Sequence, residues 1–318
     1  MARVLCLGDV NVDILLYIDS LPPLGGEVLA SKSTVAPGGA AANTCVALSR
    51  LGVDSGIIGC VGDDALGWAL AEDFRREGVD TSLLAKRGED STGFVVILVT
   101  PGGERTMLSY RGANRLLSPD DIDEEAVGRA EVLFVSGYAL LEETQRSAAI
   151  KAIEVAREGG VRVVVDMCYS LAKLGLEEVK RRVGFVDVLL TNEDEARFLS
   201  GTGDYEKLVG VLAETVYVKM GGKGSVAYRD GEIAEKPAFK IDAVDTTGAG
   251  DAFNAGIIFA GLLRLSLEDS LTLGNAVAGY KCTGRGARHL PNLEELIIFL
   301  RNRDENRIAL LLSKIRER

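Results

Sequence analysis

The sequence predicts an α/β fold, a doubly wound and mostly parallel sheet with helices on both faces and a small β lid. Short apolar segments alternate with amphipathic segments of helical length along most of the chain, which is typical of a parallel sheet covered on both faces. One Pro-Gly-Gly turn joins two alternating segments, which is a hairpin signal. The 318 residues contain no internal repeat or linker. We therefore expect a single domain over residues 1–318.

The strands and helices of this alternation are expected in the following order. The apolar run Val4–Leu7 is the first strand, the small-residue segment Ala40–Arg50 is the first helix, and Gly56–Val61 is the next strand. Further strands are expected at Val132–Val135, Val161–Val165, Val186–Leu190 and Thr215–Lys219, and helices at Thr144–Glu158, Leu171–Arg182 and Glu193–Ser200. The rest of the chain is expected to be helical, at Ala252–Arg264, Leu267–Thr283, Leu293–Leu300 and within 301–318.

Two stretches, at about 15–35 and 91–112, interrupt the alternation. The second contains two expected strands, Gly93–Thr100 and Glu104–Tyr110, joined by Pro101-Gly-Gly. Both stretches are expected to form a small β element that projects from the main sheet. Its position suits a lid over a binding site.

Composition and charge exclude several classes of protein. The net charge is −11, and a broad acidic surface repels nucleic acids and anionic membranes. The five cysteines are scattered and there is one histidine, so neither a zinc site nor a disulfide framework is expected. No apolar run reaches membrane-spanning length, and the apolar stretch at the N-terminus is too short for a signal peptide. These features predict a cytoplasmic protein.

The most informative motif is Val244-Asp-Thr-Thr-Gly-Ala-Gly-Asp-Ala-Phe253. Gly248, Ala249 and Gly250 open an apolar helix, and their free amides would point at a common spot where phosphate binds readily. Asp251 places a carboxylate beside that spot, as suits a general base acting on an attacking hydroxyl. The alternative is that Asp245 or Asp251 only caps the helix, which explains one aspartate but not the glycines and threonines together.

Two motifs resemble the signatures of the ribokinase-like (PfkB) family of carbohydrate kinases. Asp245-Thr-Thr-Gly-Ala-Gly-Asp251 is similar to its C-terminal signature and Gly38-Gly-Ala-Ala-Ala-Asn43 to its N-terminal one. Their order and separation make the pair far more specific than either motif alone. The resemblance implies an ATP-dependent, Mg²⁺-requiring transfer of phosphate to a sugar hydroxyl. It also implies that Asp251 is the catalytic base, with the amides of residues 248–250 as the anion hole.

Substrate-binding residues are expected in two places. Asn11 and Asp13 follow the first strand, where side chains can grip adjacent hydroxyls, and the family residue that matches Asp13 binds substrate. An Asx turn is the alternative for this pair. Gly38, Gly39 and Asn43 are expected to bring the backbone and an amide close to the sugar, or else to form only a tight strand-to-helix turn.

The lid stretch holds two further substrate candidates, Arg105 and Asn114. Gly112-Ala-Asn114 resembles ribokinases and fructokinases, in which this stretch closes over the substrate. Lid arginines such as Arg105 and Arg111 can also neutralise a transferred phosphate. Solvated charges on an edge strand are the alternative. Family lids often pair into dimers, so a homodimer through the lid is an open possibility.

ATP-binding residues follow from the resemblance of Val218-Lys-Met-Gly-Gly-Lys-Gly-Ser225 to the nucleotide-binding strand and turn of the family. Lys219, Gly221 and Gly224 are the expected contacts, and Asn275 matches a family position near the adenine. The segment is not a P-loop, because its Gly-Lys pair is followed by glycine. For Asn275 the alternative is an ordinary polar helix residue.

Thr191-Asn-Glu-Asp-Glu195 matches an Asn-x-x-Glu element of the family. It implies that Asn192 and Glu195 lie near Mg²⁺ and its waters. The alternative is a capping box in which Glu195 occupies the first helical turn, and both interpretations can hold together. A requirement for K⁺, common among ribokinases, stays open.

The leading functional hypothesis is phosphorylation of a ribose- or fructose-like sugar by ATP. A nucleoside kinase of the same family is the second, and a catalytically silent sugar- or nucleotide-sensing protein is the third. Many members of the family that the chain resembles carry Asp-Pro-Asn and then Arg where this chain has Asp166-Met-Cys-Tyr-Ser170. The missing arginine favours a neutral sugar or a nucleoside over a sugar acid.

Overall fold

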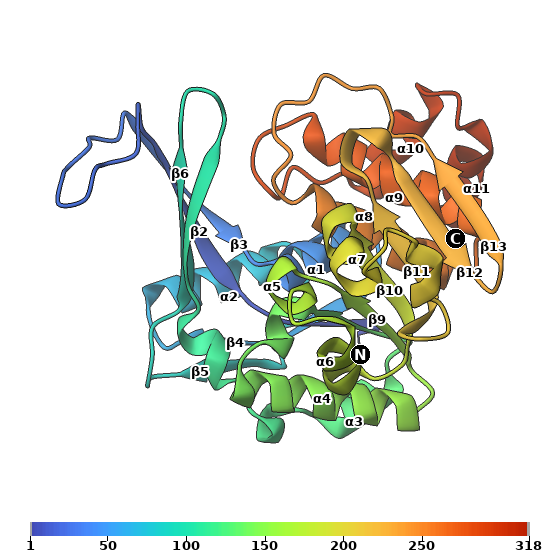
Figure 1. Ribbon diagram of the computed structural model, residues 1–318, viewed down its shortest axis with the longest axis horizontal. Coiled ribbons are helices and arrows are strands. Elements are labelled where there is room, and N and C mark those ends of the chain that lie inside the picture. The colour runs from blue at the N-terminus through green and yellow to red at the C-terminus, as the bar shows by residue number, and fades with distance from the viewer. Residues whose placement is uncertain (1, 317–318) are drawn as a thin grey trace.

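The computed structural model describes residues 2–316 and contains two sheets (Figure 1). The larger has nine strands in the order β13-β12-β11-β10-β9-β8-β1-β4-β5, and the smaller has four in the order β3-β2-β6-β7. The strands are β1 Val4–Leu7, β2 Asn11–Tyr17, β3 Lys32–Gly38, β4 Ser55–Gly62, β5 Leu84–Arg87, β6 Gly93–Val99, β7 Arg105–Tyr110, β8 Val132–Ser136, β9 Arg162–Asp166, β10 Val186–Asn192, β11 Ala213–Lys219, β12 Ser225–Arg229 and β13 Glu232–Lys236.

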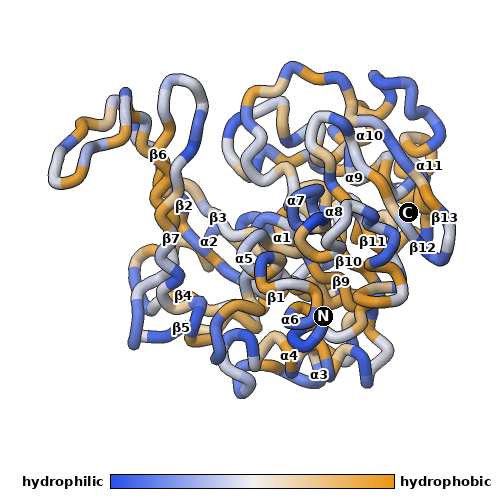
Figure 2. Tube along the Cα trace, in the orientation of Figure 1, coloured by the Kyte–Doolittle hydropathy of each residue, from blue (hydrophilic) through white to orange (hydrophobic). Residues whose placement is uncertain are grey.

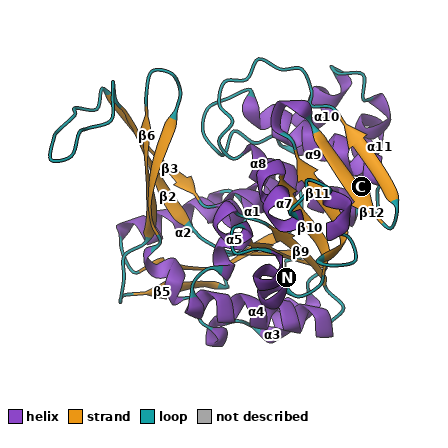
Figure 3. Ribbon diagram, viewed as in Figure 1, coloured by secondary structure: helices purple, strands orange, loops and turns teal. Residues whose placement is uncertain are grey.

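Seven neighbouring strands of the larger sheet, from β11 to β5, are parallel, and β12 and β13 extend one edge as antiparallel strands. Helices cover both faces (Figure 3). They are α1 Ala40–Arg50, α2 Ala65–Arg76, α3 Glu124–Arg129, α4 Glu143–Glu158, α5 Tyr169–Ala172, α6 Leu176–Val183, α7 Glu193–Ser200, α8 Ala249–Leu262, α9 Leu267–Cys282, α10 Leu293–Arg301 and α11 Asn306–Arg316. The doubly wound α/β prediction is confirmed.

Two apolar cores lie on the two faces of the larger sheet. One packs α1, α2 and α8 to α11 against the sheet, and the other packs α3 to α7. The strands read as nearly continuous apolar runs because both of their faces are buried. Strand β4, for example, is buried along its whole length. This frame places the carboxyl ends of β1, β9, β10 and β11 along one edge, where ligands bind in open α/β sheets.

The smaller sheet projects from the body beside that edge (Figure 1). Strands β2 and β6 pair in parallel at its centre, and β3 and β7 flank them as antiparallel strands. Figure 2 shows that the lid strands carry apolar residues as the central strands do. Several of these side chains are exposed on the lid, namely Val35, Met107, Leu108 and Tyr110.

Two expectations from the sequence need correction. The single helix expected at Leu171–Arg182 is two helices, α5 and α6, because Gly175 takes a positive φ of 85° between them and ends the helical path. Asn11 and Asp13 do follow the first strand, but both belong to lid strand β2, so the alternative of an Asx turn does not hold for this pair. No helix among residues 2–316 combines the length and apolar character needed to cross a membrane.

Candidate active site

The start of helix α8 presents free backbone amides. Gly248 precedes the helix with φ 76°, and a Cβ there would lie 2.9 Å from the Cβ of Ala287, so a larger residue does not fit. Within residues 2–316 no group accepts a hydrogen bond from the amides of Gly248, Gly250 or Asp251. The Ala249 amide, predicted to join the anion hole, instead donates to the Thr246 carbonyl at 3.1 Å. The available cluster is therefore Gly248, Gly250 and Asp251.

Asp245 holds the loop that leads into this helix. Its carboxylate accepts hydrogen bonds from the amide and hydroxyl of Thr247 and from the amide of Gly286. Burial alone would raise the pKa of Asp245, but these hydrogen bonds hold it well below its usual range. The Nζ of the fully buried Lys281 donates to the Asp245 carbonyl at 2.5 Å. None of these donors belongs to α8, and the start of that helix has no side-chain cap, so Asp245 shapes the preceding loop and the capping alternative does not hold.

Asp251 lies in the first turn of α8 and is partly exposed. Its Oδ2 accepts a hydrogen bond from the Nδ2 of Asn43 at 2.8 Å, and its Oδ1 accepts none from residues 2–316. Burial raises the pKa of Asp251 to about 7, and the nearby Asp166 adds to the rise while the Asn43 hydrogen bond opposes it. A carboxylate with a free oxygen and a pKa near neutrality suits a general base.

Asp13 and the glycines before α1 form the substrate side of the site. A Cβ at Gly38 would lie 2.3 Å from Oδ1 of Asp13, so the glycine is what allows this carboxylate to lie against the backbone. Gly39 has φ 98°, and a Cβ there would meet the Asp9 carbonyl oxygen at 2.3 Å. Burial raises the pKa of Asp13 to about 6, although Arg288 opposes the rise. The glycines therefore serve both the turn and the close approach.

The remaining substrate candidates have mixed outcomes. Asn114 is fully buried; its Oδ1 accepts from the Val10 amide and its Nδ2 donates to Oδ1 of Asn11 at 2.8 Å. Asn114 therefore positions Asn11 at the lid base, and its own contact with substrate stays a prediction. Arg105, on β7, donates from a terminal guanidinium nitrogen to Oδ1 of Asp245 at 2.6 Å. This contact ties the lid to the loop of the amide cluster.

Lys219 lies beside the amide cluster at the end of β11. Its Nζ donates to Oδ1 of Asp166 at 2.6 Å and to Oδ1 of Asn254 at 3.1 Å. A Cβ at Gly250 would be 3.7 Å from the same nitrogen. Burial opposes the charge of Lys219, but Asp166 and Glu195 raise its pKa above the usual value. The ammonium is thus held as a cation next to the amides.

Asn192 and Glu195 form the capping box that the sequence offered as an alternative. Asn192 caps α7, accepting from the Glu195 amide at 2.9 Å, and Glu195 accepts from the Asn192 amide at 3.0 Å. Burial and the neighbouring Asp166 raise the pKa of Glu195 to about 7. A divalent cation would relieve the repulsion between these two carboxylates, so the residues fit a hard cation bound through oxygen and water.

The other residues predicted to bind ATP lie at or beside the turn between β11 and β12. Gly224 has φ 114°, and a Cβ there would meet the Lys236 carbonyl oxygen at 2.0 Å, so the turn itself requires glycine. Gly221 has φ 57° and faces open space. The side chain of Asn275 is engaged, because its Oδ1 accepts from Ser225 Oγ and its Nδ2 donates to the carbonyls of Lys236 and Pro237. Asn275 therefore shapes this region from within.

Two residues at the site were missed in the sequence. Lys281 reaches the Asp245 carbonyl from α9, and Arg288 reaches Asn43 from the loop after α9. A lysine in an otherwise apolar helical face was the available signal for Lys281, since buried lysines are rare without a partner. No local pattern marks Arg288, because its partners lie more than two hundred residues away in the chain.

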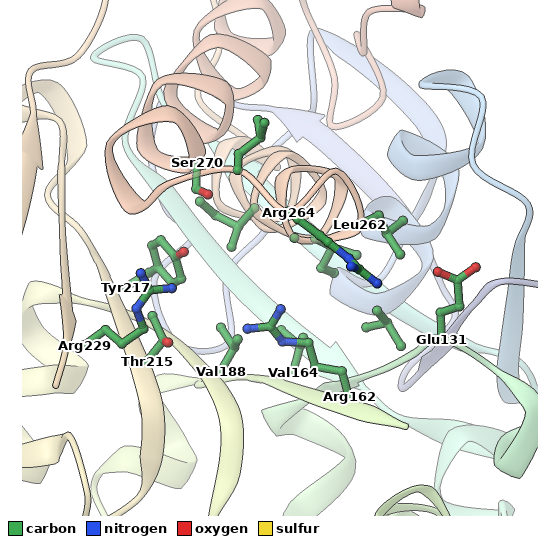
Figure 4. Close-up of a pocket in the computed structure, with 15 residues that line it drawn as sticks. Glu131, Arg162, Val164, Val188, Thr215, Tyr217, Arg229, Leu262, Arg264 and Ser270 are labelled. Atoms are coloured by element: carbon green, nitrogen blue, oxygen red, sulfur yellow. The ribbon is translucent and has the colours of Figure 1, made fainter. Parts of the chain in front are cut away.

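A cavity of about 410 Å³ lies at the opposite end of the sheet (Figure 4). It is bounded by the first residues of β8 and β9 and by the end of α8, and its lining includes Arg162, Thr215, Tyr217 and Arg264. None of the predicted site residues lines it. The chemistry of the polar cluster, and not cavity size, therefore identifies the candidate active site.

Known proteins resemble the chain over nearly its full length. The family model described as pfkB family carbohydrate kinase matches residues 1–294. An ATP-dependent ribose-1-phosphate kinase of Halopiger xanaduensis is 33% identical over 305 residues, covering 95% of this chain and 99% of that protein. A ribokinase of Haemophilus influenzae is 30% identical over 306 residues, covering 92% and 97%. A ribokinase structure of Arabidopsis thaliana with ribose and ATP superposes with a TM-score of 0.83 at 25% identity, covering 94% and 98%.

Proposed function

This chain belongs to the pfkB family of carbohydrate kinases, and we propose that Asp251 and the amide cluster of α8 carry out its ATP-dependent phosphorylation of a small sugar. The observation that carries the proposal is that, among residues 2–316, Oδ1 of Asp251 and the nearby amides of Gly248, Gly250 and Asp251 have no hydrogen-bond partner. A base and an anion hole at one point are what transfer of a phosphoryl group to an alcohol needs.

In the proposed reaction, Asp251 Oδ1 accepts the proton of the sugar hydroxyl as that oxygen forms a bond to the γ-phosphorus of ATP. The bond from the γ-phosphorus to the bridging oxygen breaks, and ADP leaves with the electron pair. The amides stabilise the charge on the equatorial oxygens. Lys219, whose Nζ lies next to Gly250, adds a fixed positive charge there. Asp13, Asn11 and Asn43 orient the sugar.

Mg²⁺ is part of the proposal. Glu195 and Asn192 would hold it through water, and bound Mg²⁺ neutralises phosphate charge. The raised pKa of Glu195, caused by burial and by Asp166, is what supports a cation there.

For K⁺, the structure offers a positively charged side chain in place of a bound ion. The ammonium of Lys281 is buried beneath the 245–248 loop and donates to the Asp245 carbonyl. An added monovalent cation that stabilised this loop would have to bind the same Asp245 carbonyl oxygen. We therefore propose that Lys281 supplies the cation and that the kinase needs no K⁺.

We propose a ribose- or fructose-like acceptor. The substrate side offers a carboxylate and amides, Asp13, Asn11 and Asn43, and these recognise hydroxyl groups. The test is a coupled assay of ADP release over ribose, fructose, ribose 1-phosphate and adenosine. The highest kcat/KM on ribose or fructose supports the proposal. Preference for adenosine would make the chain a nucleoside kinase, and no ADP release with any acceptor would support a sensing role.

The lid and the cellular setting complete the proposal. The lid, formed by about 15–35 and 91–112, closes over the sugar as part of one ribokinase-like domain. Its exposed Val35, Met107, Leu108 and Tyr110 offer an apolar surface for the lid of a second copy, and light scattering tests this homodimer. All five cysteines are free and buried, which fits a reducing cytoplasm.

A further inference from the structure

A chain of hydrogen bonds leads from Arg288 to the proposed base. The Nε of Arg288 donates to Oδ1 of Asn43 at 3.3 Å, and the Nδ2 of Asn43 donates to Oδ2 of Asp251 at 2.8 Å. Its first two members are buried, since Asn43 is 5% exposed and the Arg288 side chain is 9% exposed. The chain joins α1, α8 and the loop that follows α9.

The chemistry of these groups allows only one direction of donation. A guanidinium has donors and no acceptor, and an ionised carboxylate has acceptors and no donor. The Asn43 amide must therefore turn its oxygen to Arg288 and its NH₂ group to Asp251. If the amide flipped, two donors would face each other at Arg288 and two oxygens would face each other at Asp251. Arg288 thus selects the orientation in which Asn43 supports the base.

Arg288 is itself held from several sides. A terminal guanidinium nitrogen is paired with Asp73 of α2, and its Cζ lies 5.5 Å from the ring centroid of Phe74. The Arg50 side chain donates to the backbone carbonyls of Arg288 and Leu290 at 3.1 and 3.0 Å, which fixes the loop. The other terminal nitrogen is buried and has no hydrogen-bond partner among residues 2–316. Burial of an unpaired donor costs free energy, so the position of this arginine calls for a physical explanation.

We infer that Arg288 is a positioning residue for phosphoryl transfer, which through Asn43 holds Asp251 with one carboxylate oxygen free for the sugar hydroxyl. The inference rests on the proposed role of Asp251 as the base. Asn43 donates to Oδ2, so Oδ1 is the oxygen that no group in residues 2–316 engages and that we assign to receive the proton. Loss of this relay, the hydrogen bonds from Arg288 through Asn43 to Asp251, would let the Asp251 carboxylate rotate. It would also remove a hydrogen bond from the ionised form of Asp251.

The relay also affects when Asp251 is ionised. Burial and Asp166 raise its pKa, Asp13 adds to the rise, and Lys219 and the Asn43 hydrogen bond lower it. Lys281 of α9 also faces this cluster. Without the Asn43 bond the pKa of Asp251 rises further, so the acid limb of the kcat profile moves to higher pH.

Two substitutions of Arg288 distinguish the effect of its hydrogen bond to Asn43 from the effect of its positive charge. In Arg288→Gln, Nε2 occupies the position of the arginine Nε along the side chain, so a donor to Asn43 remains. In Arg288→Met a methyl group occupies that position. Both variants lose the ion pair with Asp73, so any change that follows from charge or stability is common to both. Arg285→Met, an exposed arginine three residues away, is the control.

The experiment is kcat against pH at saturating ATP and sugar, with folding checked by thermal unfolding. We expect Arg288→Gln to keep the wild-type acid limb and Arg288→Met to shift it up by about one unit, the effect of one hydrogen bond to a charged group. With a pKa near 7 that shift lowers kcat about fivefold at pH 7. Identical limbs in the two variants would overturn the inference.

Two further variants keep the test decisive. If neither Arg288 variant folds, Asn43→Ala breaks the same relay and must shift the limb in the same direction; an unchanged limb overturns the inference. Asp251→Asn distinguishes failure of the proposed base from failure of the proposed relay. If it turns over normally, the base is wrong. If it is inactive while Arg288→Met keeps the wild-type limb, only the relay is wrong.

Discussion

Lys281 gives the sharpest test of the proposed cation. Its Nζ lies 2.5 Å from the Asp245 carbonyl oxygen and is fully buried under the loop of the amide cluster. A hydrogen bond from a charged group contributes about 1.5–3 kcal/mol. At 1.4 kcal/mol for each factor of ten, its loss reduces the population of the correctly held loop roughly 10- to 150-fold. We expect kcat to fall in that range.

Two variants distinguish loss of charge from loss of packing. Lys281→Met fills the space with an apolar chain, and Lys281→Ala leaves a gap next to the carbonyl. We expect both to lose activity, and only Lys281→Ala to recover it when ammonium, ethylammonium or K⁺ is added. Lys151→Met is the matched control, because Lys151 also donates to a backbone carbonyl, that of Pro119 at 3.1 Å, far from the site.

The assay is ADP release at saturating ATP and sugar in a buffer whose only other cations are Mg²⁺ and choline. The wild-type enzyme should work fully there and should not respond to K⁺. Strong stimulation of the wild-type enzyme by K⁺ would refute the reasoning. Full activity of Lys281→Ala without any added cation would refute it as well.

The other predictions concern the base and the lid. Asp251→Asn should lower kcat about a hundredfold or more while calorimetry still detects ATP binding; normal turnover would contradict its role. Because burial raises the pKa of Asp251 to about 7 and a base must be ionised, kcat should fall as the pH drops below about 7; a flat profile from pH 5 to 9 would argue against it. Between pH 3.8, the usual pKa of an aspartate, and about pH 7, Asp251 is protonated in the folded state and ionised in the unfolded state. The folded state therefore loses stability as the pH rises through this range. Asp251→Asn should therefore raise Tm at pH 8 and leave it unchanged at pH 4, as scanning calorimetry can measure. Arg105→Met breaks a partly exposed ion pair with Asp245, worth about 1 kcal/mol or less, so the KM for sugar should rise a few-fold with kcat nearly unchanged; a large loss of kcat would assign Arg105 to the chemistry.

The sequence by itself determined the fold class and the amide cluster. Parallel strands buried on both faces must be apolar throughout, so β1, β8 and β9 were visible as short runs. Gly248 and Asp251 were visible because a helix that begins with glycines and an aspartate is unusual unless its amides are used. The turn at Gly224 and the turn formed by the glycines before α1 could also be predicted from the sequence, since few residues other than glycine tolerate their backbone angles or close contacts.

Only the tertiary structure decided which side chains meet. Asn114, which we predict to bind substrate, is buried and holds Asn11, a contact that the sequence did not show. Ala249 uses its amide within the turn. Lys281 reaches the site from α9 and Arg288 from the loop after it, and the sequence near them does not show which groups they contact. Local patterns fix backbone conformation because they act over a few residues, whereas the partner of a buried charge is set by packing between elements hundreds of residues apart.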